Sequence, residues 1–260
     1  MASAELTVII PVYNEVMTVG PLLDAVLAAP YEKQVIVVDD GSTDGTGEAL
    51  ALWRTRSVRP IELVTHPTNR GKGAAIRTAL VHARGRVVLI QDADLEYDPS
   101  QYPIVVEPIL DGRADAVYGS RYLMSDGQLP WTLNRVCVVF LNATVRLLYG
   151  YRLTDEATCY KAFRGEILAR MDLHCQRFEF CPEVTAKACR MGVRLLEVPI
   201  RYKPRSRDEG KKIRWQDGVE AITTLFRWRF AKFEAAPLAF EAPPQNLSKW
   251  APAAVSSIKN

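Results

Sequence analysis

Two acidic segments, each directly after an apolar run, carry the residues of this chain best suited to chemistry. Asp92 and Asp94 follow the apolar run 87–90, and Glu96 comes two positions later. Side chains at positions i and i+2 of an extended segment point the same way, so this DxD pair can reach one ion. Carboxylate oxygens suit Mg²⁺ or Mn²⁺, which complete their coordination with water and substrate phosphate. Taken alone, the pair is also typical of a solvated turn with a helix-capping aspartate.

A second acidic segment, Asp39-Asp40, follows the apolar run 35–38 and precedes the polar turn 41–46. Turn and helix-cap chemistry is the plain alternative for Asp40 and for the hydroxyl residues after it. Buried strand ends with carboxylates are costly unless a partner holds them. The repetition of this pattern at two strand ends therefore favours one shared site.

The glycine-rich loop 69–73 places Lys72 at the expected start of a helix. Its glycines would let the backbone approach a ligand, and a cation near a helix N-terminus favours phosphate. The loop is not a P-loop, because it lacks the first glycine spacing and a Ser or Thr after the lysine. We expect Lys72 to contact the ligand, and Arg70 to do so or simply to begin the helix.

Strands and helices alternate through the first half of the chain. The apolar patterns predict strands at 6–12, 34–39, 61–65, 87–91 and 116–119, and helices at 16–28, 46–56, 71–82 and 100–110. This alternation indicates an α/β fold with a doubly wound, mostly parallel central sheet flanked by helices. Ligands of such sheets bind beyond the carboxyl ends of the strands, where all the segments above fall.

The second half is less regular. It predicts helices at 131–149, 183–191 and 215–233 and strands at 159–163 and 193–200. We expect one domain over residues 1–233, with a donor half at about 1–120 and an acceptor half at about 121–233. Residues 234–260 are rich in Pro and Ala without periodicity, so we predict a mobile tail.

Composition excludes several classes. The 260 residues are 48% hydrophobic and 24% charged with a formal net charge of +3, which is ordinary for a soluble globular protein. The five cysteines form no CxxC pair and indicate reduced thiols in a cytosolic protein. The sequence shows no signal-peptide pattern, and no apolar run approaches the roughly 20 residues of a membrane span. A nicotinamide-dependent Rossmann enzyme is disfavoured, because no GxGxxG follows the first strand.

Six motifs occur in one order that resembles a known family: VIIPVYNE (8–15), DDGSTDGT (39–46), GKG (71–73), QDADLEYDP (91–99), GSRY (119–122) and EGKKIRW (209–215). The chain is identified over about residues 6–233 as similar to GT-A-type, family 2 inverting glycosyltransferases. Within that family it resembles most the dolichol-phosphate mannose synthases and related polyprenyl-phosphate sugar transferases.

The resemblance implies a donor in which GDP or UDP carries the sugar. Carboxylates such as Glu15 and Asp39 would accept hydrogen bonds from ribose hydroxyls or a base N–H. Asp94 would be the principal ligand of Mg²⁺ or Mn²⁺, with Asp92 near ribose or metal and Glu96 either a third ligand or an adjustment of local charge. The ion would neutralise the leaving nucleotide diphosphate. The donor-binding residues implied are Pro11, Tyr13, Glu15, Asp39, Asp40, Lys72 and Asp92.

For the acceptor, the resemblance implies polyprenyl phosphate. A phosphate monoester with a second pKa of about 6 is largely dianionic near neutrality and needs no general base, only cations that hold it in line. Arg121 and Arg135 fit that task, and Arg207, Lys211 and Lys212 could close over both phosphates, with a solvated basic loop as the alternative. Asp94, Arg121 and Arg207 are thus the implied catalytic residues. A hydroxyl acceptor would instead need a carboxylate base, for which Glu179 and Glu183 are the candidates.

Two apolar segments bear on location. Residues 131–149, and residues 225–233 with their interleaved Arg and Lys, have the pattern of interfacial helices, or else both pack on the sheet. We expect a cytoplasmic protein, peripheral on the inner face of the cell membrane if the acceptor is a lipid. No nucleic-acid partner is expected, because no aromatic stacking pattern accompanies the basic stretch.

Two further functions stay open. The first is a family 2 enzyme that acts on a soluble hydroxyl or phosphate acceptor. The second is a nucleotidyltransferase or a non-catalytic nucleotide-sugar binder. A nucleotidyltransferase would place a Gly-rich loop after its first strand, where this chain has Tyr13-Asn14-Glu15.

Overall fold

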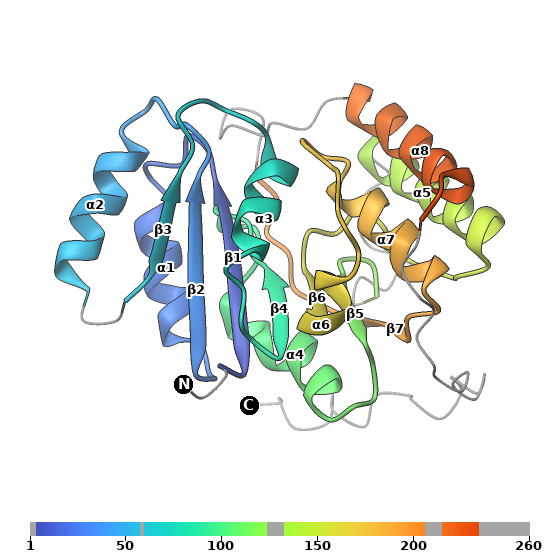
Figure 1. Cartoon of the computed structure of the whole chain (residues 1–260), viewed down its shortest axis with the longest axis horizontal. Coiled ribbons are helices and arrows are strands. Elements are labelled where there is room, and N and C mark those ends of the chain that lie inside the picture. The colour runs from blue at the N-terminus through green and yellow to red at the C-terminus, as the bar shows by residue number, and fades with distance from the viewer. Residues whose placement is uncertain (1–3, 58–59, 124–132, 206–214, 234–260) are drawn as a thin grey trace.

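A mostly parallel sheet forms the centre of the protein. The computed structural model describes residues 4–57, 60–123, 133–205 and 215–233, and in them the seven-stranded sheet has the order β3-β2-β1-β4-β6-β5-β7 (Figure 1). Every neighbouring pair is parallel except the two made by β6. The strands are β1 (Leu6–Val12), β2 (Lys33–Asp39), β3 (Glu62–Thr65), β4 (Val87–Ile90), β5 (Ala116–Ser120), β6 (Lys161–Arg164) and β7 (Leu195–Pro199).

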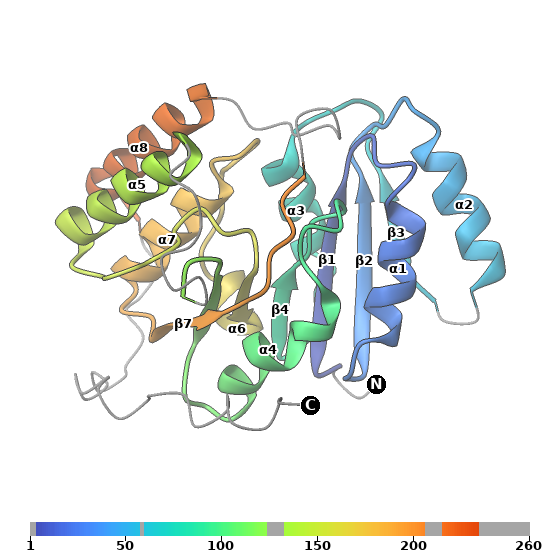
Figure 2. The ribbon, with the colours of Figure 1, turned by 180° about the vertical axis from the view of Figure 1, so that it is seen from behind.

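Helices cover both faces of this sheet, as Figures 1 and 2 show from opposite sides. The first face carries α1 (Val19–Ala28), α2 (Thr46–Arg56), the short 3₁₀ turn η1 (Pro99–Gln101) and α4 (Tyr102–Leu110). The other face carries α3 (Lys72–Leu80), α6 (Gly165–Ala169) and α7 (Phe180–Arg190), with α5 (Leu133–Tyr149) and α8 (Trp215–Phe230) packed side by side outside α7.

The continuous apolar runs have a simple cause. A strand that is covered on both faces must be apolar at successive positions, and all four residues of β4 are buried. Along β1, Ile9 packs into the core under α3, whereas Val8 and Ile10 pack into the core under α1 and α4. The alternation of side chains thus divides one strand between two cores.

The predicted architecture is confirmed, and the differences lie in the second half. β6 runs antiparallel to β4 and β5, pairing Phe163 with both Val88 and Ala116. Helix α7 begins at Phe180, three residues before the predicted start, because Pro182 is tolerated in a first turn, where its missing N–H has no helical partner. The short elements η1 and α6 were not predicted. The proposed tail, 234–260, lies outside the described residues, and the domain limits stay predictions.

Candidate functional site

The carboxyl ends of β1, β2 and β4 meet at one edge of the sheet. Val12 is in register with Asp39, and the N–H of Gln91 donates to the carbonyl of Ile9 at 2.9 Å. The chain after each strand, with Glu15, Asp39 or Asp92, therefore leaves from the same edge. The structure brings together the acidic segments that the sequence pointed to.

Polar side chains of the turn after β2 hold the turn after β1. The N–H of Asn14 donates to Ser42 Oγ at 3.0 Å, and the N–H of Glu15 donates to Thr46 Oγ1 at 2.9 Å. In return the N–H of Thr43 donates to Asn14 Oδ1 at 2.8 Å. The hydroxyl residues of this motif thus position Glu15 in the described structure.

Asp40 organises the loop that precedes α3. Its carboxylate is buried and accepts hydrogen bonds from the N–H groups of Arg70 and Gly71 at 3.0 and 2.7 Å. His66 Nδ1 lies 2.6 Å from the same carboxylate. With these partners Asp40 fixes the entry to α3, and its contact with the donor stays a prediction. The carboxylate of Asp39, also buried, accepts from the N–H of Ser42 at 3.1 Å, and its backbone carbonyl accepts from the N–H of His66 at 2.8 Å.

The glycines of the loop before α3 lie against the backbone of residues 176–177. The sequence had suggested that they approach a ligand. The N–H of Gly73 donates to the carbonyl of Arg177 at 3.0 Å, and that of Ala74 to Gln176 at 2.8 Å. Gly71 has φ +96°, and a Cβ there would lie 2.5 Å from the Gln176 carbonyl oxygen. The first turn of α3 is therefore satisfied by residues 176–177, and only glycine allows this close approach.

Lys72, by contrast, lies at the acidic segment after β4, and its contact with the donor stays a prediction. Its Nζ lies 2.5 Å from Asp92 Oδ1 and 3.0 Å from Cys159 Sγ, and the lysine and aspartate side chains are each 15% exposed. Burial by itself would lower the pKa of Lys72, but the Asp92 carboxylate outweighs it and holds that pKa well above its ordinary value. Asp92 is thus paired with a buried cation in the segment after β4.

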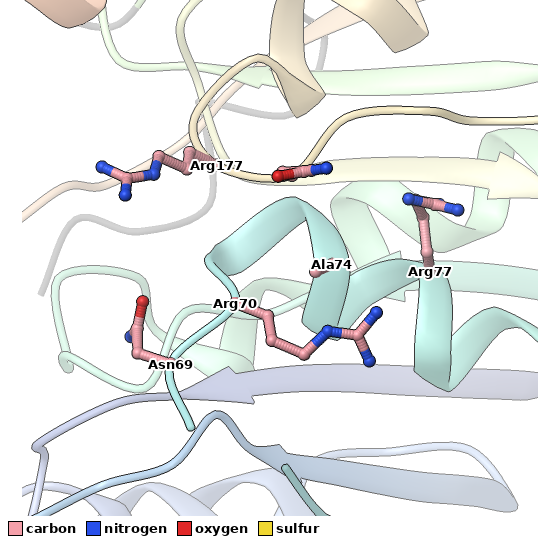
Figure 3. Close-up of a pocket in the computed structure, with 6 residues that line it drawn as sticks. Asn69, Arg70, Ala74, Arg77 and Arg177 are labelled. Atoms are coloured by element: carbon pink, nitrogen blue, oxygen red, sulfur yellow. The ribbon is translucent and has the colours of Figure 1, made fainter. Parts of the chain in front are cut away.

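Arg70 turns to a different face of α3. Figure 3 shows its side chain passing beneath the helix toward the side that carries Arg77, while Arg177 projects the opposite way. These residues line a hollow of about 230 Å³ together with Asn69, Ala74 and Gln176. Lys72 and Arg70, two residues apart, therefore serve different surfaces.

Asp94 is the most perturbed carboxyl group of the site. Burial, followed by the charges of Asp92 and Glu96, raises its pKa to about 7. Arg205 opposes this shift from a distance of 3.4 Å between its Nη2 and Asp94 Oδ2. Because burial and the neighbouring carboxylates disfavour the ionised form of Asp94, a further cation beside it would stabilise that form.

Both carboxylate oxygens of Glu96 have partners within the protein. Its two oxygens accept from Tyr202 Oη at 2.7 Å and from the N–H of Arg205 at 2.8 Å. Among the residues that the structure describes, no three His, Cys, Asp or Glu side chains are placed to hold one ion. The described contacts of Glu96 favour the alternative that it adjusts local charge, and its role as a third ligand stays a prediction, as do those of Asp92 and Asp94.

The two arginines predicted for the acceptor lie together. The guanidinium carbons of Arg121 and Arg135 are 5.7 and 5.6 Å from the ring centroid of Tyr122. Arg121 is also 5.1 Å from the ring of Tyr202, whose hydroxyl binds Glu96. Tyr202 therefore connects the arginine pair to the acidic segment after β4.

The roles of the remaining predicted residues stay predictions. Glu183 is buried, lies 2.6 Å from Lys187 Nζ and accepts from the N–H groups of His174 and Cys175, contacts that do not favour its predicted role as a base. Glu179 accepts from the N–H of Arg177 at 2.6 Å at the start of α7. Pro11 and Tyr13, both half-buried, lie at the end of β1 as expected. Arg207, Lys211 and Lys212 lie outside the described residues.

Sequence reasoning missed two residues at this site. Arg205 belongs to the basic stretch 201–214 and had the same pattern as its neighbours there. Asp155 lies beside Glu156 in an irregular segment, and it forms the ion pair with Arg121 at 2.7 Å. Neither has a local sequence signal, because each acquires its role from a partner far along the chain.

Helices α5 and α8 each bury one side and expose the other. Val138 and Leu141 of α5 and Leu225 and Trp228 of α8 are buried where the helices pack on each other and on α7. Exposed on the opposite sides are Phe140 (61%), Leu147 (81%), Phe226 and Phe230 (77%). The helices pack on each other and on α7 rather than directly on the sheet, and their interfacial role stays a prediction. Over the described residues, every helix is too short or too polar to cross a bilayer.

Comparisons with known proteins identify the family. Residues 7–172 match the model of the family described as Glycosyl transferase family 2. The chain is 33% identical to the undecaprenyl-phosphate mannosyltransferase of Micrococcus luteus over 86% of this chain and 93% of that one. It is 32% identical to the polyprenol monophosphomannose synthase of Mycolicibacterium smegmatis over 85% of each.

The fold agrees with this assignment. The chain resembles glucosyl-3-phosphoglycerate synthase of Mycobacterium tuberculosis, solved with Mn²⁺, UDP and phosphoglyceric acid. The TM-score is 0.64 at 19% identity, over 88% of this chain and 80% of that one. The GT-A fold and the family predicted from the motifs are confirmed. This chain belongs to glycosyl transferase family 2 and is a glycosyltransferase.

Proposed function

We propose that this enzyme transfers a hexose, of mannose, glucose or GlcNAc type, from a GDP- or UDP-linked donor to polyprenyl phosphate. The transfer inverts the anomeric centre and depends on a divalent cation. The observation that carries the proposal is the connection through Tyr202 of two chemically different clusters. One holds the carboxylates after β4, and the other holds Arg121 and Arg135.

The carboxylate cluster fits a magnesium or manganese ion. Asp94 is raised to a pKa of about 7 mainly by burial and neighbouring carboxylates, and Asp92 adds a second hard oxygen donor within two residues. A bound Mg²⁺ or Mn²⁺ would supply Lewis-acid neutralisation of the departing nucleotide diphosphate. Lys72, paired with Asp92, would add a positive charge on the protein side of the same phosphates.

The donor nucleoside is proposed to lie against the strand ends of β1 and β2. Glu15 is set in place by Thr46, and Asp39 keeps acceptor capacity beside the backbone N–H of Ser42. Carboxylates there can accept from ribose hydroxyls or from a base N–H. Pro11 and Tyr13 would provide the apolar wall beside them.

The acceptor side favours a phosphate nucleophile. Arg121 and Arg135 present two guanidinium groups around Tyr122, and guanidinium pairs suit phosphate oxygens. A hydroxyl acceptor would need a carboxylate base, and the buried Glu183 is already committed to Lys187. The polyprenyl-phosphate names of the relatives support a lipid carrier for this phosphate.

A lipid acceptor places the reaction at a membrane surface, and one side of the protein suits that position. Exposed apolar side chains of α5 and α8 include Phe140, Leu147 and Phe230. Residues 133–153 and 221–233 carry six Arg or Lys, while the two acids of α8, Asp217 and Glu220, lie in its first half. Beside Leu147, a hollow of about 530 Å³ is lined by Arg146, Arg152 and Leu153, among others. Apolar groups bordered by cations favour an anionic bilayer interface.

A labelled-sugar assay tests the proposal. The protein is incubated with Mn²⁺ or Mg²⁺ and radiolabelled GDP-mannose, UDP-glucose or UDP-GlcNAc, with polyprenyl phosphate in mixed micelles. We expect label in a butanol-extractable product that mild acid hydrolyses, and none after EDTA treatment. Label that enters only a water-soluble phosphate or hydroxyl acceptor would support the soluble-acceptor alternative. Nucleotide binding without any sugar release would indicate a non-catalytic binder.

A further inference from the structure

Arg205 lies between two carboxylates of the acidic cluster, which consists of Glu15, Asp92, Asp94 and Glu96. Its Nη1 donates to Glu15 Oε2 at 3.0 Å and its Nη2 to Glu15 Oε1 at 2.9 Å, a bidentate pair with the turn after β1. The same Nη2 lies 3.4 Å from Asp94 Oδ2, beyond the end of β4. One guanidinium thus bridges the carboxylate proposed to read the nucleoside and the one proposed to bind the metal.

The negative charge of this acidic cluster requires partner cations. Among the described residues, Lys72 and Arg205 are the cations within ion-pair distance of its carboxylates. The Arg205 and Asp94 side chains are each 18% exposed and Glu15 is 8% exposed, so solvent screens these charges only in part. Removing Arg205 would take away the cation that Glu15 and Asp94 share.

The backbone beneath Arg205 is anchored independently of its side chain. Its own N–H donates to Glu96 Oε1 at 2.8 Å, and the N–H of Lys203 donates to the carbonyl of Glu96 at 3.1 Å. Gln101 brackets Arg201 with two hydrogen bonds, of 2.6 and 3.1 Å. The guanidinium can therefore leave Glu15 and Asp94 by side-chain rotation while the segment after β7 stays in place.

We propose that Arg205 is the resident counter-cation of the donor site, which the divalent ion and the nucleoside must displace from Asp94 and Glu15 in order to bind. The inference rests on the proposed function, because it takes Asp94 as a metal ligand and Glu15 as a nucleoside contact. When a ligand competes with an internal partner, its apparent Kd equals its intrinsic Kd divided by the fraction of protein in which that partner is released. Arg205 therefore sets the affinity for the metal, and it couples the metal and nucleoside sites because it bridges both.

The test measures binding of Mn²⁺ alone, with no nucleotide and no turnover. Isothermal titration or electron paramagnetic resonance gives the Mn²⁺ affinity of the wild type and of Arg205→Met. We expect Arg205→Met to bind Mn²⁺ about tenfold more tightly, within the usual range of coupling between sites. It should also melt at a lower temperature than the wild type without metal and recover more on adding Mn²⁺.

Arg201→Met is the matched control. Arg201 lies in the same segment, its side chain is 71% exposed, and its nearest ion pair is with Asp98 at 4.0 Å. This variant should bind Mn²⁺ like the wild type. Should Arg205→Met fail to fold, Arg205→Lys replaces it, because an ammonium cannot make the bidentate bridge, and it should show a smaller gain in the same direction.

The outcomes separate two failures. Equal or weaker Mn²⁺ binding by the Arg205 variants, in a protein that still transfers sugar, would overturn the role of Arg205 and leave the proposed function standing. Absence of Mn²⁺ and nucleotide binding in every variant and in the wild type would overturn both.

Discussion

Arg121 and Asp155 form a bidentate ion pair, in which Nε and Nη2 of the arginine each lie 2.7 Å from one carboxylate oxygen. Asp155 is fully buried and also accepts from the N–H of Arg121 at 3.0 Å. The N–H of Asp155 in turn donates to Glu197 of β7 at 2.9 Å. Two neighbouring strands, β5 and β7, thus fix the plane of a guanidinium that the proposed function assigns to the acceptor phosphate.

Weakening the ion pair between Arg121 and Asp155 should therefore weaken binding of the acceptor. Asp155→Asn keeps the shape of the side chain but removes its charge, so the guanidinium loses its fixed orientation. We expect the KM for polyprenyl phosphate to rise about tenfold, since misplacement of a positioning group costs up to about 100-fold. The KM for the donor should stay within twofold, and an equal rise in both would contradict an acceptor role.

Loss of the arginine itself separates transfer from hydrolysis. Arg121→Ala should reduce transfer to the lipid acceptor more than the slow hydrolysis of the donor by water, because water needs no phosphate-binding cation. The two rates are measured in one assay from released nucleotide and butanol-extractable label. Equal losses in both rates would place Arg121 on the donor side.

Asp94 should be essential for turnover and not for folding. Asp94→Asn keeps the size of the side chain but removes the negative charge, and we expect turnover to fall about a hundredfold or more, the scale of a lost electrostatic contact. Its melting temperature without metal should not fall, since the wild-type group is buried beside two other carboxylates. Asp98→Asn, an exposed position of the same segment, is the control. Substantial transfer by Asp94→Asn would mean that the metal site is misassigned.

Acid stability should depend on Asp115, which is buried between Arg194 and Arg164 at 2.8 Å from each. Burial alone would raise the pKa of Asp115, but the hydrogen bonds from Arg194 and the charges of both arginines outweigh it and lower that pKa below 3.8. The stabilisation is therefore fully present above the unfolded-state pKa and is lost as pH falls through the folded-state value.

Urea unfolding of Asp115→Asn checks this sign. We expect the variant to lose about 2 kcal/mol at pH 7, typical of hydrogen bonds to a charged group. The deficit relative to the wild type should shrink at pH 3 and below, where the wild-type carboxylate also begins to protonate. A deficit of the same size at both pH values would argue against an ionised Asp115.

Membrane association should require the exposed sides of α5 and α8. Phe140→Ser with Phe230→Ser removes two exposed aromatic groups without touching the packed sides of the helices. Binding to vesicles that contain anionic lipid, measured by co-sedimentation, should weaken about tenfold or more, given the free energy of burying a Phe side chain. Val81→Ser, at an exposed site after α3, is the control. Unchanged vesicle binding would mean that this side does not face the lipid.

The sheet and the meeting of its acidic ends were predictable because the signal is local. Buried parallel strands are continuous apolar runs, and the residue after each run lies at the ligand-binding edge. Asp39, Asp92 and Asp94 follow directly from that rule. The antiparallel direction of β6 could not be predicted from that rule, because it depends on the path of the chain through α5.

The role of a single residue could not be predicted where that role depends on a partner far away in the sequence. Gly71 and Gly73 look like a ligand loop until residues 176–177, about a hundred positions later, take their space. Glu96 looks like a metal ligand until Tyr202 and Arg205 take both its oxygens. Local sequence does not encode which side chain arrives from the far half of the chain.

In the basic stretch 201–214, too, the sequence alone did not indicate that Arg205 belongs to the site. Arg205 and Arg207 are two residues apart in one charged run, and the family resemblance favoured Arg207. The bridge between Tyr97 and Tyr202, together with the contacts of Gln101, sets the register that brings Arg205 to Glu15. The charge pattern alone does not show the pairing that brings Arg205 to Glu15.

The most direct test of the account is anomalous X-ray scattering from a crystal grown with Mn²⁺ and GDP or UDP. We predict a manganese peak about 2–2.5 Å from an Asp94 carboxylate oxygen, with the nucleotide diphosphate on its other side and the Arg205 guanidinium moved off Asp94. A nucleotide bound without manganese at Asp94, or a manganese peak away from the ends of β1, β2 and β4, would contradict it.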